Sequence, residues 1–153
     1  MQTMKSRTDL ITEVFGVVGR FRRQLRRSVP RGFDSAWLTE SQAELLWLIG
    51  RRPGISISAA AAELGLVPNT ASTLVSKLVS NGLLLRTVDA TDRRVGRLRL
   101  VGPTQQIVDA SRTARRALLS EVFDELDDDQ IESLTKGLEV LDTMTRKLQE
   151  RRS

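Results

Sequence analysis

The chain has 153 residues with no cysteine, histidine or tyrosine, and its 24 Lys and Arg outnumber 19 Asp and Glu, a formal net charge of +5. These absences exclude disulfides, thiolate metal sites, the commonest general base and metal ligand, and a phenolic acid. No apolar run approaches the roughly 20 residues that span a bilayer and no apolar signal core is visible, so we expect a cytoplasmic protein with no membrane, metal or cofactor.

Charged residues are segregated along the chain. Residues 1–33 hold eight Lys and Arg and two acids, residues 64–100 hold six and two, and residues 121–132 hold seven acids and no base. Net charge alone is weak evidence for nucleic-acid binding, because many soluble proteins are mildly basic. The segregation of charge along the chain is more informative than the net charge, since solubility does not require basic and acidic residues to be segregated.

The N-terminal segment predicts one amphipathic helix. Apolar residues recur at three- and four-residue steps between Leu10 and Leu25, which predicts a helix over about residues 7–28 that ends before Pro30. Two internal glycines destabilise this helix by about 1 kcal/mol each relative to alanine. We therefore expect the helix to pack closely against another segment at that point.

Two shorter helices are predicted next. Thr39 and Gln42 form a capping box, in which each side chain binds the other residue's backbone N–H, and the helix that starts there ends near Gly50. An Ala-rich helix follows over residues 57–64, and Gly65 ends it because glycine tolerates the left-handed backbone conformation.

A fourth helix and a hairpin follow. The helix covers about residues 68–81, and its expected inward-facing residues are Leu74, Val75 and Leu78. Residues 84–88 and 97–101 are candidate strands on either side of a basic loop over 89–96. In the second strand leucines alternate with arginines, so one face is expected to be buried.

Two long helices complete the chain. Gly102 starts one that runs to about Leu126, and Asp127 caps the last. The acidic segment 121–132 could suggest a divalent-cation site, but it lacks the spacing of a calcium loop, and acids at a helix N-terminus complement the helix dipole. We therefore interpret it as a helix junction. The last helix carries a near-heptad apolar stripe of Ile131, Leu134, Leu138, Leu141 and Leu148.

The order of elements over residues 57–101 is helix, turn, helix and hairpin, which is typical of a winged helix–turn–helix that places one helix in a DNA major groove. The predicted fold is mainly α with a small β-wing. We expect a winged DNA-binding domain over 37–102 and a helical dimerisation domain over 1–36 and 103–153. No phosphate-cradling loop, nucleophile elbow or metal-ligand set is visible, so we expect no enzyme.

A specific set of residues accompanies this order of elements: Leu38-Thr39, Leu64-Gly65-Leu66, Pro68, Asn81-Gly82-Leu83, Arg86 and Asp92-x-Arg94. With its helical flanks, the chain resembles the multiple-antibiotic-resistance-regulator (MarR) family over essentially its whole length. The resemblance implies a homodimer in which the N-terminal helix and the last two helices interleave. The candidate interface residues are Leu10, Val14, Ile131, Leu134, Leu138, Leu141 and Leu148.

The resemblance also implies a repressor of double-stranded operator DNA. Helix 68–81 would enter the major groove of a pseudo-palindromic operator, the wing over 89–97 would enter the minor groove, and a small aromatic or anionic effector would release the DNA. The alternative is a winged-helix protein that binds DNA without operator preference, or that binds another protein.

The candidate DNA-binding residues lie on the fourth helix and the wing. Those on the helix are short polar side chains and one lysine, suited to base edges and phosphates, although a merely solvated face would have the same composition; they are Asn69, Thr70, Ser72, Thr73, Ser76 and Lys77. By analogy with the family, Arg86, Arg93, Arg94 and Arg97 join them, and Arg94 enters a narrow minor groove. Asp92 would orient an arginine through a paired hydrogen bond, the alternative being a surface ion pair worth at most about 1 kcal/mol.

Some residues depart from the family pattern. Val67 stands where relatives often have a capping residue, so we expect the cap to move to Asn69. Without cysteine and histidine, thiol oxidation and zinc sensing are not expected, which leaves a small organic effector or none. The candidate effector-binding residues are Phe21, Trp37 and Trp47, with core packing as the alternative for Trp47.

Overall fold

The computed structural model describes residues 4–33 and 38–152. Within them it is mainly helical with one small antiparallel sheet, as predicted. The elements in chain order are α1 (Arg7–Ser28), α2 (Glu40–Arg51), α3 (Ile57–Leu64), α4 (Pro68–Ser80), β1 (Leu84–Val88), β2 (Gly96–Leu100), α5 (Gly102–Asp124) and α6 (Asp128–Glu150). None of the helices in these described ranges is both long and apolar enough to cross a membrane.

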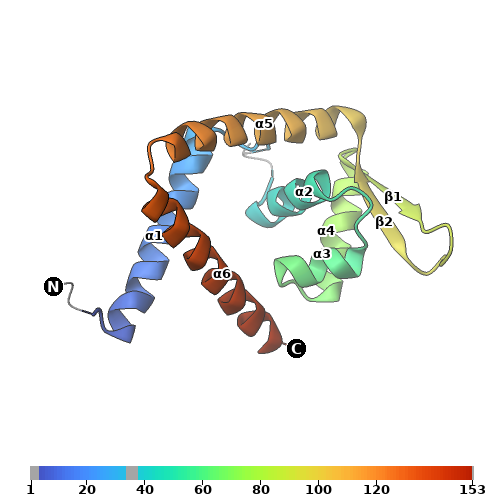
Figure 1. Ribbon diagram of the computed structural model, residues 1–153. Helices are drawn as coiled ribbons and strands as arrows, with labels where there is room; N and C mark the ends of the chain where they lie inside the picture. The colour runs from blue at the N-terminus through green and yellow to red at the C-terminus, as the bar shows by residue number, and fades with distance from the viewer. Residues whose placement is uncertain (1–3, 34–37, 153) are drawn as a thin grey trace.

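The elements separate into a compact module and a set of long helices. Helices α2, α3 and α4 lie together beside the β1–β2 hairpin, and α5 extends away from this module to the region of α1 and α6 (Figure 1). Helix α6 then turns back, so that its C-terminal end lies closer to α3 than its start does (Figure 1). The winged module therefore projects from one end of a helical frame.

The hydrophobic core lies inside the winged module. Its buried members come from α2, the turn before α3, α3, α4 and both strands, with Phe33 and Val108 added from the flanking segments; they are Phe33, Ala43, Leu45, Leu46, Leu48, Ile49, Ile55, Ala60, Val75, Leu78, Leu84, Leu98, Leu100 and Val108. The core thus extends past both expected domain boundaries, and the division at 36/37 and 102/103 remains a prediction.

Local signals explain where the helices of the module begin and end. The Gln42 N–H donates to Thr39 Oγ1 at 3.2 Å and the Thr39 N–H donates to Gln42 Oε1 at 2.9 Å, which confirms the predicted capping box. Gly65 ends α3 with a φ of +67°, a conformation that favours glycine. Asp127 caps α6 in the same way as Thr39 caps α2, so the acidic segment does form a helix junction.

The hairpin pairs β1 with β2 in an antiparallel register from Leu84 opposite Leu100 to Val88 opposite Gly96. The second strand begins at Gly96, one residue earlier than predicted, because Gly96 still pairs with Val88. Leu98 and Leu100 are buried and Arg99 is exposed, as the alternation predicted.

Helices α1 and α6, of 22 and 23 residues, contain no buried residue within one chain. Large apolar side chains on both are exposed, including Phe15 at 78% and Leu148 at 63%. Among the described residues, the atoms nearest to the space above Gly16 and Gly19 are guanidinium groups of arginines of α1 itself. The described part of one chain therefore does not make the close packing expected at these glycines.

Candidate nucleic-acid interface

Helix α4 presents a polar face to solvent and an apolar face to the core. Ala71, Val75 and Leu78 are buried on the inner side. All six predicted residues of this helix are exposed, namely Asn69, Thr70, Ser72, Thr73, Ser76 and Lys77. No acidic residue lies anywhere in α4. The outer face can therefore offer hydrogen-bond donors and acceptors to a polyanion without introducing a negative charge.

The start of α4 differs from the sequence-based expectation. Val67 occupies the N-cap position with an extended backbone and no side-chain capping bond, and Pro68 is the first helical residue. The predicted shift of the cap to Asn69 is therefore wrong. Proline has the backbone torsion of a helix already and needs no partner for an absent N–H, so α4 begins there without a polar cap. The Asn69 side chain is left on the exposed first turn.

A hollow of about 260 Å³ separates the starts of α3 and α4 from the wing. Ser56 and Ser58 line it from α3, Ser72 from α4, and Arg86 and Arg94 from the hairpin. Two of the predicted arginines thus lie at the same hollow as a predicted residue of α4. Polar side chains of α4 and of the wing therefore border one hollow.

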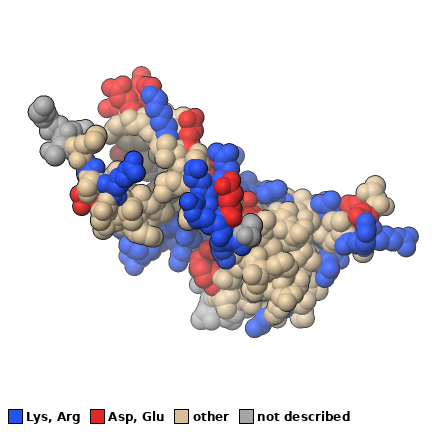
Figure 2. All heavy atoms as spheres, turned by 90° about the horizontal axis from the view of Figure 1, so that it is seen from below, with Lys and Arg blue, Asp and Glu red and all other residues tan. Residues whose placement is uncertain are grey.

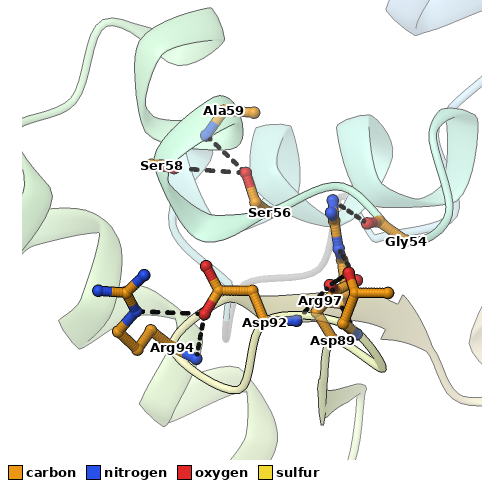
Figure 3. A network of polar contacts seen from close by, with 9 residues as sticks. Gly54, Ser56, Ser58, Ala59, Asp89, Asp92, Arg94 and Arg97 are labelled. Atoms are coloured by element: carbon orange, nitrogen blue, oxygen red, sulfur yellow. Dashed lines mark hydrogen bonds and ion pairs between the residues drawn. The ribbon is translucent and has the colours of Figure 1, made fainter.

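The tip of the wing carries two exposed arginines. Arg93 is exposed, and the Arg94 side chain is 92% exposed. The Arg94 backbone N–H and Nε both donate to Asp92 Oδ1, at 3.0 and 3.2 Å (Figure 3). Asp92 therefore contacts the Arg94 guanidinium through Nε alone, while the rest of that guanidinium extends outward, and the orienting role of Asp92 remains a prediction.

A second carboxylate, Asp89, was missed by sequence reasoning and lies at the centre of the wing loop. Its Oδ2 accepts from the Thr91 hydroxyl at 2.7 Å, from the Thr91 N–H at 3.2 Å and from the Asp92 N–H at 3.0 Å. The Thr91 hydroxyl, then the Asp92 N–H and Arg97, lower the pKa of Asp89 to about 2. The available signal was an aspartate two residues before a threonine, a pattern typical of a turn closed by its own side chain.

Arg97 faces inward rather than outward. Its Nε donates to Asp89 Oδ1 at 3.2 Å and its Nη1 donates to the Gly54 carbonyl at 3.3 Å (Figure 3). Its side chain is 41% exposed, less than half the value for Arg94. The structure therefore separates Arg97 from the outward-facing arginines of the wing.

Basic groups gather at the end of the molecule that the wing occupies. Figure 2 shows them projecting there beside acidic atoms. Acidic groups are scarce in this view on the neighbouring surface of the module. A polyanion could approach this end with little repulsion.

The two candidate effector residues that the structure describes, Trp47 and Phe21, do not line the same hollow. Trp47 is half-buried, with the Arg115 guanidinium 4.8 Å from the centre of its ring, and it lines a hollow of about 370 Å³ together with Arg22, Arg31 and Arg51. Phe21 is 55% exposed on α1 and does not line that hollow. Trp37 lies outside the described residues.

The sequence matches one family model, described as the MarR family, over residues 38–95. This segment covers α2, α3, α4, β1 and the whole wing loop. No curated protein matches the sequence.

Solved structures share the fold over nearly the whole chain. FabT of Streptococcus pneumoniae in complex with DNA has a TM-score of 0.69 at 22% identity, covering 92% of this chain and 96% of that one. A MarR transcriptional regulator of Methanosarcina mazei Go1 gives 0.64 at 20% identity, with 92% and 99% covered. CouR of Rhodococcus jostii RHA1 bound to p-coumaroyl-CoA gives 0.62 at 22% identity, with 90% and 95% covered.

The family match lies on the winged module, and the shared fold adds the long helices that flank it. Residues 38–95 therefore match the MarR family, whose members are transcriptional regulators and not enzymes, and the chain as a whole shares the fold of a solved MarR transcriptional regulator.

Proposed function

We propose that the protein is a homodimeric repressor that acts in the cytoplasm on a pseudo-palindromic operator. One observation carries the DNA-binding part: the acid-free outer face of α4 and the exposed Arg94 of the wing border the same hollow. Helix α4 would read base edges in the major groove, and Arg94 would enter the adjacent minor groove. Arg86 and Arg93 would add contacts to the phosphate backbone, which position the protein without reading sequence.

The proposed dimer follows from the uncovered apolar surface. Leu10, Leu134, Leu138 and Leu148 are between 36% and 63% exposed, and Val14, Ile131 and Leu141 are half-buried. Val14 and Leu141 also line a groove of about 470 Å³ between α1 and α6. Exposed apolar surface of this extent is characteristic of an interface, and a second copy with the same helices would cover it.

A dimer would present two copies of α4 to one side of the DNA. Their separation would match half-sites about one helical turn apart, roughly 10 bp. Bound in this way over a promoter, the dimer would hinder transcription. The same geometry predicts a two-fold symmetric operator, because each wing and each α4 would occupy equivalent positions on their half-sites.

The hollow beside Trp47 is the proposed site of a small anionic aromatic effector. Among the described residues, Arg22, Arg31, Arg51 and Arg115 line it against two carboxylates, Glu44 and Glu63. An aromatic ring would pack against Trp47, and a carboxylate or phosphate would pair with the guanidinium groups. The ligand named for CouR, p-coumaroyl-CoA, has both an aromatic ring and anionic groups. The hollow lies between α1, α2 and α5, so a ligand there would contact both the frame and the winged module.

The decisive experiment is selection of bound duplexes from random DNA with the full-length protein. The proposal predicts an enriched motif with two inverted half-sites whose centres lie about 10 bp apart. Enrichment of a single isolated half-site would contradict the dimer geometry. Equal, salt-dependent binding to unrelated duplexes would instead support the alternative, a winged-helix protein without operator preference.

The effector part is tested separately, by quenching of tryptophan fluorescence with p-coumarate as the probe. Quenching that disappears in Trp47→Phe, accompanied by release of the selected operator, would support the site. Undiminished quenching in Trp47→Phe would contradict it, because the remaining signal would then come from Trp37.

A further inference from the structure

We propose that Asp89 is the residue that positions the wing, and that Arg97 braces the wing against α3 instead of contacting DNA. The expected effect on DNA affinity rests on the proposed DNA-binding function. The organisation of the wing loop by Asp89 does not depend on DNA. Asp89 was not among the residues expected from the family resemblance, and Arg97 was expected to contact DNA.

The Asp89 carboxylate is fully engaged within the wing loop. Three donors from Thr91 and Asp92 converge on its Oδ2, and Arg97 Nε binds its Oδ1. The Asp89 backbone N–H also donates to the Val95 carbonyl at 2.9 Å, which closes the loop from the other side. The loop backbone over 89–95 is therefore organised around this one side chain.

Arg97 carries the same network to the body of the module. Its Nη1 binds the carbonyl of Gly54 in the turn before α3, and Arg97 forms an isolated antiparallel bridge with Ser56. Ser56 caps α3 by accepting the Ala59 N–H at 3.1 Å (Figure 3). The contacts thus run continuously from the wing loop to the first turn of α3.

The network ends at the outward-facing arginine. Asp89 holds the Asp92 N–H, and the Asp92 side chain holds the backbone N–H and Nε of Arg94. Asp89 therefore acts on DNA through Asp92 and Arg94, without touching DNA itself. Arg97 has two donors committed to protein acceptors on its inner side, whereas the Arg94 side chain is 92% exposed.

For Asp89→Asn, the loss of negative charge and the loss of the positioning contacts predict opposite changes in DNA affinity, so a measurement of affinity distinguishes the two effects. Asp89→Asn removes a negative charge near the proposed DNA surface, so electrostatics alone would tighten DNA binding. Loss of the charged acceptor, however, weakens its hydrogen bonds and loosens the loop, and we expect affinity to fall by about tenfold at fixed salt. Glu121→Gln, at an exposed acid on α5 outside the wing, is the matched control and should leave affinity unchanged or slightly raised.

Arg97→Lys separates bracing from direct contact. Lysine keeps the positive charge but cannot bridge Asp89 and Gly54 with a planar fork of donors. If Arg97 braces the wing, Arg97→Lys should lose about as much DNA affinity as Asp89→Asn, and the double variant should lose little more, because both disrupt the shared Arg97–Asp89 contact of one network. Affinity retained in Arg97→Lys, or additive losses in the double variant, would overturn the bracing role.

A readout on the free protein tests the positioning role independently of DNA. Amide hydrogen exchange at Thr91 and Asp92 should be faster in Asp89→Asn than in the parent, and trypsin should cleave faster after Arg93 and Arg94, while exchange in α2 stays unchanged. Parental exchange and cleavage rates in Asp89→Asn would refute the positioning role even if DNA binding fell. Faster exchange in a protein whose parent binds no duplex would support positioning while refuting the proposed function.

Discussion

Arg94→Ala tests the proposed minor-groove contact with little risk to the fold. The Arg94 side chain is 92% exposed, and its side-chain contact is one Nε–Asp92 bond at the wing tip. The backbone N–H of residue 94 would still bind Asp92 Oδ1 in the alanine variant. We therefore expect a dimer with unchanged helical content and unchanged thermal stability.

The expected loss of DNA affinity in Arg94→Ala depends on how many Arg94 side chains the dimer brings to the DNA. A positioned arginine in a groove contributes about 1 kcal/mol or more, and a dimer loses two of them, so the binding free energy should weaken by about 2 kcal/mol. At about 1.4 kcal/mol per factor of ten, the dissociation constant should rise about 30-fold. Removing two cations at the DNA should also flatten the slope of log affinity against log salt concentration by about 1 to 2.

Fluorescence anisotropy with the selected operator, measured across a salt series, gives both quantities. Arg116→Ala removes the same charge from an exposed position on α5, away from the wing, and serves as the control. Equal affinities for the parent and Arg94→Ala at fixed salt would refute the wing contact. An equally large loss in Arg116→Ala would show that only overall charge matters.

Three further predictions concern assembly, stability and ionisation. Replacing Leu138 and Leu141 together with Asp places charges on the apolar stripe of α6, so sedimentation should report a monomer with intact helices, and a persistent dimer would contradict the assigned interface. Gly65→Ala adds a β-carbon at a φ of +67°, so urea melts should show a loss of about 1–2 kcal/mol, and unchanged stability would contradict the backbone argument. The pKa of Asp89 is lowered from 3.8 to about 2, chiefly by the hydroxyl of Thr91, so its stabilising contribution is present above pH 3.8 and is lost as the pH falls through about 2. The carbon shift of its carboxyl should titrate near pH 2, and a midpoint near 3.8 would count against the network.

Features of the fold and of the site that depend on residues close together in the sequence could be predicted from the sequence. The Thr39–Gln42 capping box and the glycine end of α3 depend on residues three or fewer positions apart, and both are present. The contact between Asp92 and Arg94 is equally local. The exception is the start of α4, where a polar cap was expected at Asn69 and proline made one unnecessary.

The sequence by itself therefore determined the order of the elements, their approximate ends, the buried side of the hairpin and the outward face of α4, because periodicity and capping act within a few residues. Only the tertiary structure decided that Arg97 binds Gly54, 43 positions away, and that the Arg115 guanidinium lies over Trp47. It also decided that Val108 of α5 belongs to the core of the winged module. Such contacts depend on how whole elements pack together, and no local pattern of residue types specifies which distant donor meets which acceptor.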